Sequence, residues 1–426
     1  MHPSCREDFR IAIICALPIE YDAISLVFDQ FWDGSGDKFG KLPEDPNNYT
    51  TGRIGNHNVV LAMLSHIGKA SAASVIASIC RSYVNIRLAI VTGICGGVPL
   101  GGRDGSQEML LGDVVISNIV VQHDFGKRYP DRFHRKDTIQ SDLNKPSKEL
   151  RSLLLAVTTE TGLERLQQRT NDFLQELQAT AVRKNRRTQY TYPGKAEDRP
   201  FEADYRHMHH NSPSCICREW SINSDPVCVD APFLTCDDLG CEKAHLIPRK
   251  RLQSSEPGIK GPPMPAIHFG PIASGDTVMK SGVERDIIAK REEVIAFEME
   301  SAGIWEEVPS IVVKGVCDYS DCHKNKNWQT FAAATAASAV KAVLERYSPR
   351  EKAPPNHKSP QKPTIAPTVR QDGSRFVSHV EGKEIKQGNQ MKISSQESRN
   401  YAQGGSFFGG STKSESSVTQ GNTMTF

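Results

Sequence analysis

The 426-residue chain is poor in the apolar side chains that a compact fold needs throughout. Hydrophobic residues make up 38% of it, and its mean hydropathy is -0.45. Part of the chain must therefore add little to a core, within a length that allows one large domain or two ordinary ones. No apolar run is long enough to span a bilayer, so we expect no membrane segment. The formal charge of +2 is nearly balanced, and nothing in it favours a nucleic-acid partner.

The first ten residues also lack the features of a secretory signal. They are polar and include Arg6, Glu7, Asp8 and Arg10. Eleven cysteines in such a chain are expected to be reduced thiols rather than a disulfide framework. We therefore expect a cytoplasmic protein.

Short runs rich in Ile and Val alternate with helix-like stretches over most of the chain. The candidate strands are Ile11–Cys15, Val59–Leu64, Leu88–Thr92, Val114–Ile119, Ile267–Ala273, Val294–Glu298 and Ile311–Val316. Apolar residues at helical spacing predict a helix from Ser147 to Val157 and further helices over Leu163–Val182 and Trp328–Tyr347. Strands that alternate with helices favour an α/β layer fold.

Two stretches interrupt this alternation. Residues 183–265 are rich in Arg, His, Pro and Cys without a sustained period, which predicts a loop-rich insertion. Residues 349–426 are rich in Pro, Ser, Gly, Gln and Asn, and such a segment buries too little surface to offset its ordering entropy. We therefore predict one domain over residues 9–348, followed by a low-complexity, disordered tail over residues 349–426.

The insertion holds residue types that bind zinc. They are Cys215, Cys217, Cys228, Cys236, Cys241 and His245, with His207, His209 and His210 nearby. A closed zinc site needs four such ligands, which C-x₂-C pairs commonly supply, and the sequence contains no such pair. We therefore expect a loop packed by free thiols and no bound metal, with zinc ligation as the alternative.

Residues that carry chemistry follow the C-terminal ends of several candidate strands. In α/β sheets, reactive groups gather at this edge, where strands end and loops begin. The segments concerned are Ala16–Glu20, Thr92–Gly97, Ser274–Asp276, Glu298–Ser301 and Cys317–Asp321. We therefore expect carboxylates to cluster at one edge of the sheet, beside a glycine-rich turn.

The order and spacing of these segments resemble the nucleoside phosphorylase / methylthioadenosine nucleosidase superfamily. The matching pieces are Ile11–Ala16 with Glu20, Gly68-Lys69, Thr92–Gly97, Gly112-Asp113, Ser274–Asp276, Phe297–Glu300 and Cys317-Asp318. The resemblance implies a three-layer nucleoside phosphorylase-like fold, with a central mixed β-sheet flanked by helices, as a catalytic domain over residues 9–348. It also implies a purine nucleoside or nucleotide substrate, no cofactor and a homo-oligomer.

The resemblance assigns a role to each matching residue. Asp318 corresponds to the acid that protonates purine N7, and Glu20 to the carboxylate that activates the attacking water. Glu300 corresponds to the residue that binds ribose hydroxyls, Met299 to one that packs on the sugar, and Lys314 stands where nucleosidases have an arginine. The further candidates for substrate contact are Gly96, Thr92, Gly93, Glu298, Ser274 and Met279.

Two features bear on the nucleophile and on the 5′ end of the substrate. Phosphorylases of the superfamily hold phosphate with arginines and a serine, but the corresponding residues here are Ile90, Val91 and Ile94. Because an apolar side chain cannot compensate a phosphate dianion, water is the expected nucleophile. Lys127 and Arg128 open a basic cluster that suits a phosphorylated substrate such as AMP or ATP. The alternative is a solvated charged face.

A short motif occurs twice in the tail, at an offset of 33 residues. Ile385–Ile393 recurs as Val418–Phe426, within two copies over about 374–393 and 406–426. Alternating apolar and polar positions with Gly-Asn turns suit two rungs of a stacked β-arch. The copies resemble fungal heterokaryon-incompatibility prion-forming domains, which implies a receptor protein as partner. The alternative is a disordered tail with a chance repeat.

Together these features favour a purine nucleosidase that releases adenine or another purine base, with an effector role in fungal immune-type signalling. A catalytically silent nucleotide-binding sensor is the main alternative, and a phosphorylase is a further one. Glu20, Glu300 and Asp318 favour the enzyme, because a pure binder needs no acid at purine N7.

Overall fold

The computed structural model describes residues 2–33, 39–102, 105, 107–136, 148–212, 214–219, 227–253 and 262–348, together with seven short strands between Arg375 and Thr425. The chain divides into two units, Met1–Pro349 and Arg350–Phe426. Within the described ranges, no helix is both long and apolar enough to cross a membrane.

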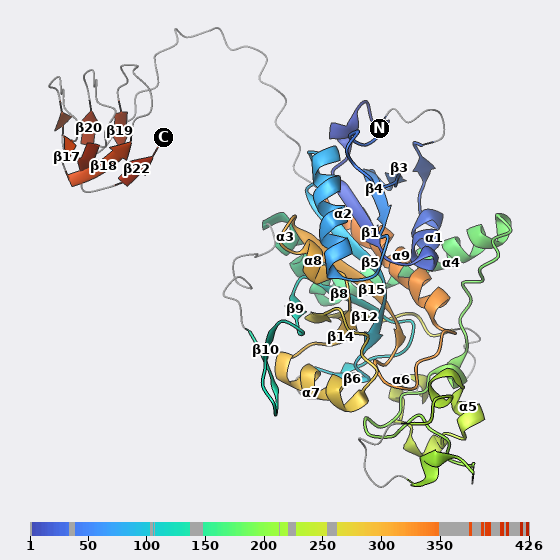
Figure 1. Ribbon diagram of the computed structural model, residues 1–426. Helices are drawn as coiled ribbons and strands as arrows, with labels where there is room; N and C mark the ends of the chain where they lie inside the picture. Colours follow the sequence, from blue (N-terminus) through green and yellow to red (C-terminus); the bar gives the residue numbers. More distant parts are fainter. Residues whose placement is uncertain are drawn as a thin grey trace. The chain divides into compact units, whose positions relative to one another are not determined.

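The first unit is built on a mixed β-sheet (Figure 1). Its main strands are β1 (Ile11–Cys15), β2 (Gln30–Phe31), β3 (Tyr49–Ile54), β4 (His57–Met63), β5 (Leu88–Gly97), β8 (Val114–Ser117), β12 (Ile267–Phe269) and β15 (Ser310–Asp318). They follow the order β12-β8-β15-β5-β1-β4-β3-β2. β15, β5, β1 and β4 run parallel, whereas β8 is antiparallel to β15 and β3 to β4.

Three short strands extend the sheet beside β5. They are β9 (Val120–Gln122), β13 (Ile272–Ser274) and β14 (Ala296–Glu298), and β14 pairs antiparallel with the end of β5. The apolar run predicted as one strand over Ile267–Ala273 is therefore divided between β12 and β13. Gly270 and Pro271 interrupt it, because proline has no N–H to donate to a ladder.

Helices cover the sheet on both faces (Figure 1). They are α1 (Pro18–Leu26), α2 (Lys69–Ser82), α3 (Lys148–Thr158), α4 (Glu160–Arg183), α7 (Gly282–Glu292), α8 (Ser301–Ile304) and α9 (Gln329–Arg346). The alanine-rich α9 packs on β5 and β15 and is covered by α1 and α4, while α2 packs against α8. Every residue from Phe331 to Leu344 is buried. The predicted α/β fold, a central mixed sheet flanked by helices, is confirmed.

Outside the sheet, the described residues of the first unit form two hairpins and part of the insertion at residues 183–265. The hairpins pair β6 (Leu100–Gly101) with β7 (Gln107–Glu108), and β10 (Gly126–Arg128) with β11 (Phe133–Arg135). The insertion forms the yellow-green part of Figure 1. Its described residues contain only short helices, namely α5 (Cys236–Leu239), α6 (Lys250–Gln253) and the 3₁₀ turns Lys195–Glu197, Ile216–Glu219, Ala231–Phe233 and Lys243–His245.

The second unit pairs the two copies of the tail motif strand by strand. Its strands are β16 (Arg375–Phe376), β17 (Ile385–Lys386), β18 (Gly388–Lys392), β19 (Tyr401–Gln403), β20 (Ser406–Phe408), β21 (Val418–Gln420) and β22 (Thr423–Thr425). β17 lies parallel to β21 and β18 to β22, with Ile385 opposite Val418 and Met391 opposite Met424. The paired residues are 33 positions apart in the chain, which is the offset of the sequence repeat. The sequence predicts disorder over residues 349–426. These short strands differ from that prediction, and the rest of this range lies outside the described residues.

Candidate active site

A cavity of about 160 Å³ opens where β1, β5, β14 and β15 end. Seven of the predicted site residues line it, namely Glu20, Gly96, Met279, Glu298, Met299, Glu300 and Asp318. Ala16, Leu17, Ile67, Ile94, Cys95, His123, Phe297, Ser320 and Lys324 also contribute. Glu20 and Asp318, which lie at opposite ends of the sequence of this unit, therefore face one space.

Backbone amides hold the carboxylate of Glu20. Its Oε2 accepts the N–H groups of Ala16 at 2.8 Å and Leu17 at 2.9 Å, and its Oε1 accepts that of Ile94 at 2.8 Å. Burial raises the pKa of Glu20 against the opposing charge of Lys314. A carboxylate with a raised pKa is the stronger proton acceptor near neutral pH.

Gly93 and Thr92 do not line the cavity, although both were candidates for substrate contact. Gly93 has φ +134°, and a Cβ there would lie 2.1 Å from Oε1 of Glu20. Its lack of a side chain therefore makes room for the carboxylate rather than for a substrate. The hydroxyl of Thr92 is buried and has no hydrogen-bond partner among the residues that the structure describes.

Lys314 lies beneath the cavity and neutralises its carboxylates. Its Nζ is 3.0 Å from Oε2 of Glu300 and 3.6 Å from Oε2 of Glu298, and its side chain is 1% exposed. Burial opposes the charge of Lys314, but Glu300, Glu298 and Glu20 raise its pKa overall. Lys314 is absent from the cavity lining, so its charge acts on the carboxylates and not on a bound molecule.

Glu298 shapes the turn that presents Met299 and Glu300. Its carboxylate accepts the N–H groups of Glu300 and Ser301, each at 3.1 Å, and also the hydroxyl of Ser301. A carboxylate at this point caps the first turn of α8. The hydroxyl of Ser274 accepts the N–H of Ala302 at 3.1 Å in the same turn, so Ser274 supports the cavity without lining it.

Asp318, at the end of β15, has the lysine Lys324 beside it. Its Oδ1 accepts the N–H of Ser320 at 2.8 Å and lies 3.0 Å from Nζ of Lys324. Cys317 donates its thiol to Oδ2 at 3.3 Å. A Cβ at Gly96 would lie 2.7 Å from Oδ1 of Asp318, so the glycine turn lets β5 approach this carboxylate closely.

Lys127 and Arg128 lie outside the cavity lining. Both are exposed on β10, in the hairpin that follows His123 along the chain. His123 itself lines the cavity. The basic pair is therefore positioned beyond the rim of the described cavity rather than inside it.

Two of the matching motifs form a network of polar contacts at the rim of the cavity. Lys69 directs its Nζ to Asp124 at 2.7 Å and to Asp276 at 3.4 Å, and Asp276 donates its N–H to Asp124 at 2.8 Å. This network fastens the start of α2 to the turn after β13. The Gly68-Lys69 and Ser274–Asp276 segments thus support the rim of the cavity.

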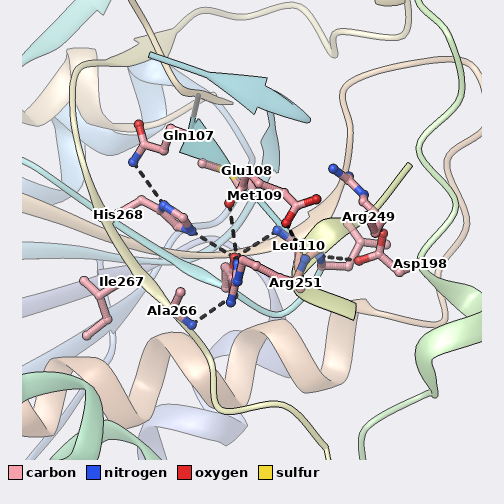
Figure 2. Close-up of polar contacts among 12 residues, drawn as sticks. Gln107, Glu108, Met109, Leu110, Asp198, Arg249, Arg251, Ala266, Ile267 and His268 are labelled. Atoms are coloured by element: carbon pink, nitrogen blue, oxygen red, sulfur yellow. Dashed lines mark hydrogen bonds and ion pairs between the residues drawn. The ribbon is translucent and has the colours of Figure 1, made fainter. Parts of the chain in front are cut away.

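The Gly112-Asp113 motif is a buried anchor outside the cavity lining. Figure 2 labels four of the residues around it, Leu110, Arg251, Ala266 and His268. Asp113 accepts the N–H groups of Leu110 and Ala266, each at 2.9 Å, and pairs with Arg251 and with Nε2 of His268 at 2.9 Å. Burial opposes its ionisation, but His268 and Arg251 lower the pKa of Asp113 overall. Arg251 belongs to the insertion, so Asp113 ties the insertion to the sheet.

The cysteines and histidines of the insertion gather in two groups. One consists of His207, Cys236, Cys241 and His323, and the other of His209, Cys215, Cys217 and Cys228. His245 lies outside both, with its Nδ1 2.8 Å from Glu202. His323 was not among the predicted ligands, because it lies 78 residues beyond His245, in the loop that follows Asp318.

Comparison with known proteins agrees with the motifs. Residues 10–189 match the phosphorylase superfamily. The chain is 32% identical over 352 residues to a nucleotide-binding leucine-rich repeat (NLR)-like protein of the fungus Hyaloscypha variabilis. The alignment covers 81% of this chain but only 30% of that protein, so the chain spans under a third of its relative's length.

Solved nucleosidase structures also align with the chain. A 5′-methylthioadenosine/S-adenosylhomocysteine nucleosidase from S. pneumoniae does so with a TM-score of 0.45 and 18% identity, over 80% of this chain and 100% of that one. The futalosine hydrolase of Helicobacter pylori does so with a TM-score of 0.41 and 15% identity, over 79% of this chain and 98% of that one.

Proposed function

We propose that the first unit hydrolyses the N-glycosidic bond of purine nucleosides or nucleotides and releases the free base. Glu20 and Asp318 line one cavity with Glu300 and Met299 beside them, and this arrangement carries the proposal. The match of residues 10–189 to the phosphorylase superfamily supports chemistry at a sugar–base bond. Two carboxyl groups across one bond are what acid–base hydrolysis of a glycoside requires.

The proposed reaction uses both carboxyl groups at once. Water adds to C1′ of the sugar and gives its proton to Glu20, while the C1′–N9 bond breaks and its electron pair goes to the purine. Asp318 gives a proton to N7, so the base leaves neutral. Each such proton transfer is worth about 10²–10⁴-fold in rate. Glu300 binds the ribose hydroxyls, and its charge stabilises the positive character that develops on the sugar.

The side chains around the glycine turn favour water over phosphate as the nucleophile. Ile94 lines the cavity, and Ile90 and Val91 are buried in β5. The nearest buried cation, Lys314, already neutralises carboxylates. Lys324, the lysine of the lining, pairs with Asp318. A phosphate dianion beside Ile94 would therefore lose its hydration without gaining an unpaired counter-charge.

Base release by the purified chain, with and without inorganic phosphate, tests the proposal. We expect release at the same rate in both, and we expect Glu20→Gln and Asp318→Asn each to lower kcat by about 10²–10⁴-fold. Asp131→Asn is the matched control, because this carboxylate is 67% exposed and lies outside the cavity. Release that requires phosphate would indicate a phosphorylase, and nucleotide binding without any release would indicate a sensor.

We propose in addition that the preferred substrate carries 5′-phosphates, as AMP or ATP does. Support comes from Lys127 and Arg128, two exposed cations in the hairpin that follows His123 at the cavity. Replacing both by Ala should raise KM for ATP and leave KM for adenosine unchanged. Replacing Arg183 and Lys184, an exposed pair at the end of α4, serves as the control. Cleavage of adenosine with ATP left intact contradicts this part.

We further propose that the enzyme is a signalling effector whose second unit assembles with a receptor protein. The NLR-like name of the fungal relative and the in-register pairing of the two tail copies support this role. Parallel, in-register strands leave open edges that template further copies. The full chain should form fibres that bind amyloid dyes, and a chain ending at residue 348 should not. Equal behaviour of the two chains contradicts the assembly role.

A further inference from the structure

Four side chains from three separate segments meet beside the loop that follows Asp318. They are His207, Cys236, Cys241 and His323, and we refer to them as tetrad A. The Nδ1 atoms of the two histidines are 3.3 Å apart. The Sγ of Cys236 lies 3.7 Å from Nδ1 of His207 and 3.6 Å from that of His323, and the Sγ of Cys241 lies 3.9 Å and 4.0 Å from them.

These separations are those of ligands around one tetrahedral zinc ion. Zn–N bonds of about 2.0–2.1 Å and Zn–S bonds of about 2.3 Å at tetrahedral angles place two nitrogens about 3.3 Å apart and a nitrogen and a sulfur about 3.6 Å apart. The two nitrogens of tetrad A match this, and its sulfurs lie within a few tenths of an ångström of it. An ion at the centre needs only a small contraction of the group.

The hydrogen bonds of the two histidines turn both Nδ1 atoms toward the centre of the tetrad. Nε2 of His207 lies 2.9 Å from the carbonyl of Leu234, and Nε2 of His323 lies 3.1 Å from the carbonyl of Tyr205. A carbonyl only accepts, so both Nε2 atoms carry hydrogen, and in the neutral rings both Nδ1 lone pairs point into the tetrad. Two lone pairs at 3.3 Å repel unless a proton or a metal ion lies between them, and a zinc ion accepts both at once. Such outer carbonyls orient metal-bound histidines in general.

A second group has the composition of a Cys₃His site. His209, Cys215, Cys217 and Cys228 form tetrad B, in which all ligand atoms lie within 4.8 Å of one another. Nδ1 of His209 is 3.4 Å from Sγ of Cys215 and 3.3 Å from Sγ of Cys228. Its ligands lie along the chain between His207 and Cys236 of tetrad A, so the two groups are nested in one stretch of the insertion.

We propose that the insertion binds two structural zinc ions, one in tetrad A and one in tetrad B. Sets of thiolates and imidazoles select zinc over the harder divalent cations, and four protein ligands leave no open position for catalysis. The described insertion consists of loops and short helices, so it has little regular structure to hold it together. Coordination of zinc by these side chains supplies folding free energy that the loops and short helices lack. This inference is independent of the proposed hydrolysis.

The zinc ion of tetrad A also fastens the cavity to the insertion. His323 immediately precedes Lys324, whose Nζ lies 3.0 Å from Asp318. The ring of Phe201 stacks on His323 at 4.0 Å, and the N–H of His207 points to Sγ of Cys322 at 3.4 Å. Loss of this zinc therefore frees the loop that carries Lys324. His323 is a positioning residue for the cavity rather than part of its lining.

Elemental analysis of the purified full chain tests the proposal directly. We expect two zinc ions per chain, one for each tetrad. Cys241→Ser should remove one zinc ion, and Cys228→Ser should remove the other. Cys80→Ser is the control, because this half-buried thiol belongs to neither tetrad and its variant should keep both ions. If the wild-type chain contains a single zinc ion and only one of the two variants loses it, the tetrad changed in that variant binds zinc and the proposal for the other tetrad is overturned.

A measurement on the unaltered chain covers the case in which a variant does not fold. Chelation should release two zinc ions and expose five further reactive thiols, those of Cys215, Cys217, Cys228, Cys236 and Cys241. Reconstitution with cobalt should give the intense visible bands of tetrahedral, thiolate-bound Co²⁺. Chelation should also lower the melting temperature. The proposal would be overturned if the chain, purified from zinc-supplemented medium, contained far less than one zinc ion per chain and if chelation left its melting temperature unchanged.

Discussion

Gly93 leaves the space that the carboxylate of Glu20 occupies. A Cβ at Gly93 would lie 2.1 Å from Oε1 and 2.3 Å from Cδ of Glu20. The next residue, Ile94, donates its N–H to the same Oε1 at 2.8 Å. The bend of β5 at a glycine thus provides both the room and one of the hydrogen bonds that fix the proposed base.

Replacing Gly93 by Ala should therefore abolish most of the activity. The new methyl group displaces Glu20, and loss of a positioned general base lowers kcat by about 10²-fold or more. Gly55→Ala is the matched control, because Gly55 also has a positive φ, +58°, but nothing lies within 4 Å of its Cβ position. It should cost about 1–2 kcal/mol of stability and leave kcat unchanged. A fully active Gly93→Ala enzyme would show that Glu20 is not the base.

Lys314 should be required for folding because its carboxylate partners are buried. Lys314→Met leaves Glu298 and Glu300 without a counter-charge, which destabilises a protein by about 3–5 kcal/mol. Adding Glu298→Gln should recover part of the loss, since one uncompensated carboxylate is then removed. Chemical denaturation measures both free energies of unfolding. Similar stability of wild type and Lys314→Met would mean that the carboxyl groups are protonated without the lysine.

The rate of base release should fall on the acid side with an apparent pKa above that of an ordinary glutamate, about 4.3. Glu20 must be ionised to accept a proton, and burial raises its pKa. The measurement is kcat/KM against pH, which reports groups of the free enzyme. An acid limb at or below the ordinary value would assign that limb to another group.

The raised pKa of Glu20 also makes the free energy of unfolding depend on pH in a definite direction. A buried group whose pKa is raised in the folded protein contributes most below its unfolded pKa, and this contribution is lost as the pH rises through the folded pKa. Acidification through that window should therefore stabilise wild type relative to Glu20→Gln. Parallel denaturation curves of both proteins at several pH values check the direction, and a difference that does not vary with pH contradicts it.

Asp113 should matter for stability and not directly for chemistry, because it does not line the cavity. Asp113→Asn breaks the pairing with Arg251 and His268 and should cost about 3–5 kcal/mol. The pKa of Asp113 is lowered, so its contribution is present above about pH 3.9 and is lost as the pH falls through the folded pKa. The deficit of the variant should therefore shrink in acid. Asp131→Asn, on the surface, should cost at most about 1 kcal/mol.

The sequence predicted the sheet well where strands are buried on both faces. β1 and β15 are runs of Ile and Val without alternation, as parallel central strands usually are, and their bounds lie within two residues of those predicted. The two-residue strand β2 and the six-residue β3 carry no such signal and were not anticipated. β2 is the edge strand of the sheet and β3 lies next to it, and such strands depend on their partners more than on their own residues.

Only part of the site could be anticipated in this way. The carboxylates after β1 and β15 share a cavity because both strands run parallel to β5 and end at one edge. Glu298 and Glu300 reach the same cavity from β14, which runs antiparallel to β5. Thr92, Ser274 and Lys314 lie outside the lining. The hydroxyl of Ser274 accepts the N–H of Ala302 and Lys314 pairs with Glu300, and these tertiary contacts are not visible in a strand pattern. The proximity of Lys324 to Asp318 depends on the path of a loop, for which sequence spacing gives no rule.

By itself the sequence determined the layer architecture, the edge at which the acids gather and the 33-residue offset of the tail copies, because each is a periodic or ordered pattern along the chain. The tertiary structure alone decided which side chains converge. It brought His207 and His323 to 3.3 Å, placed Glu20 in the space left by Gly93 and left Lys127 beyond the cavity. Convergence depends on how loops close over long separations, and a local pattern of residues does not encode that closure.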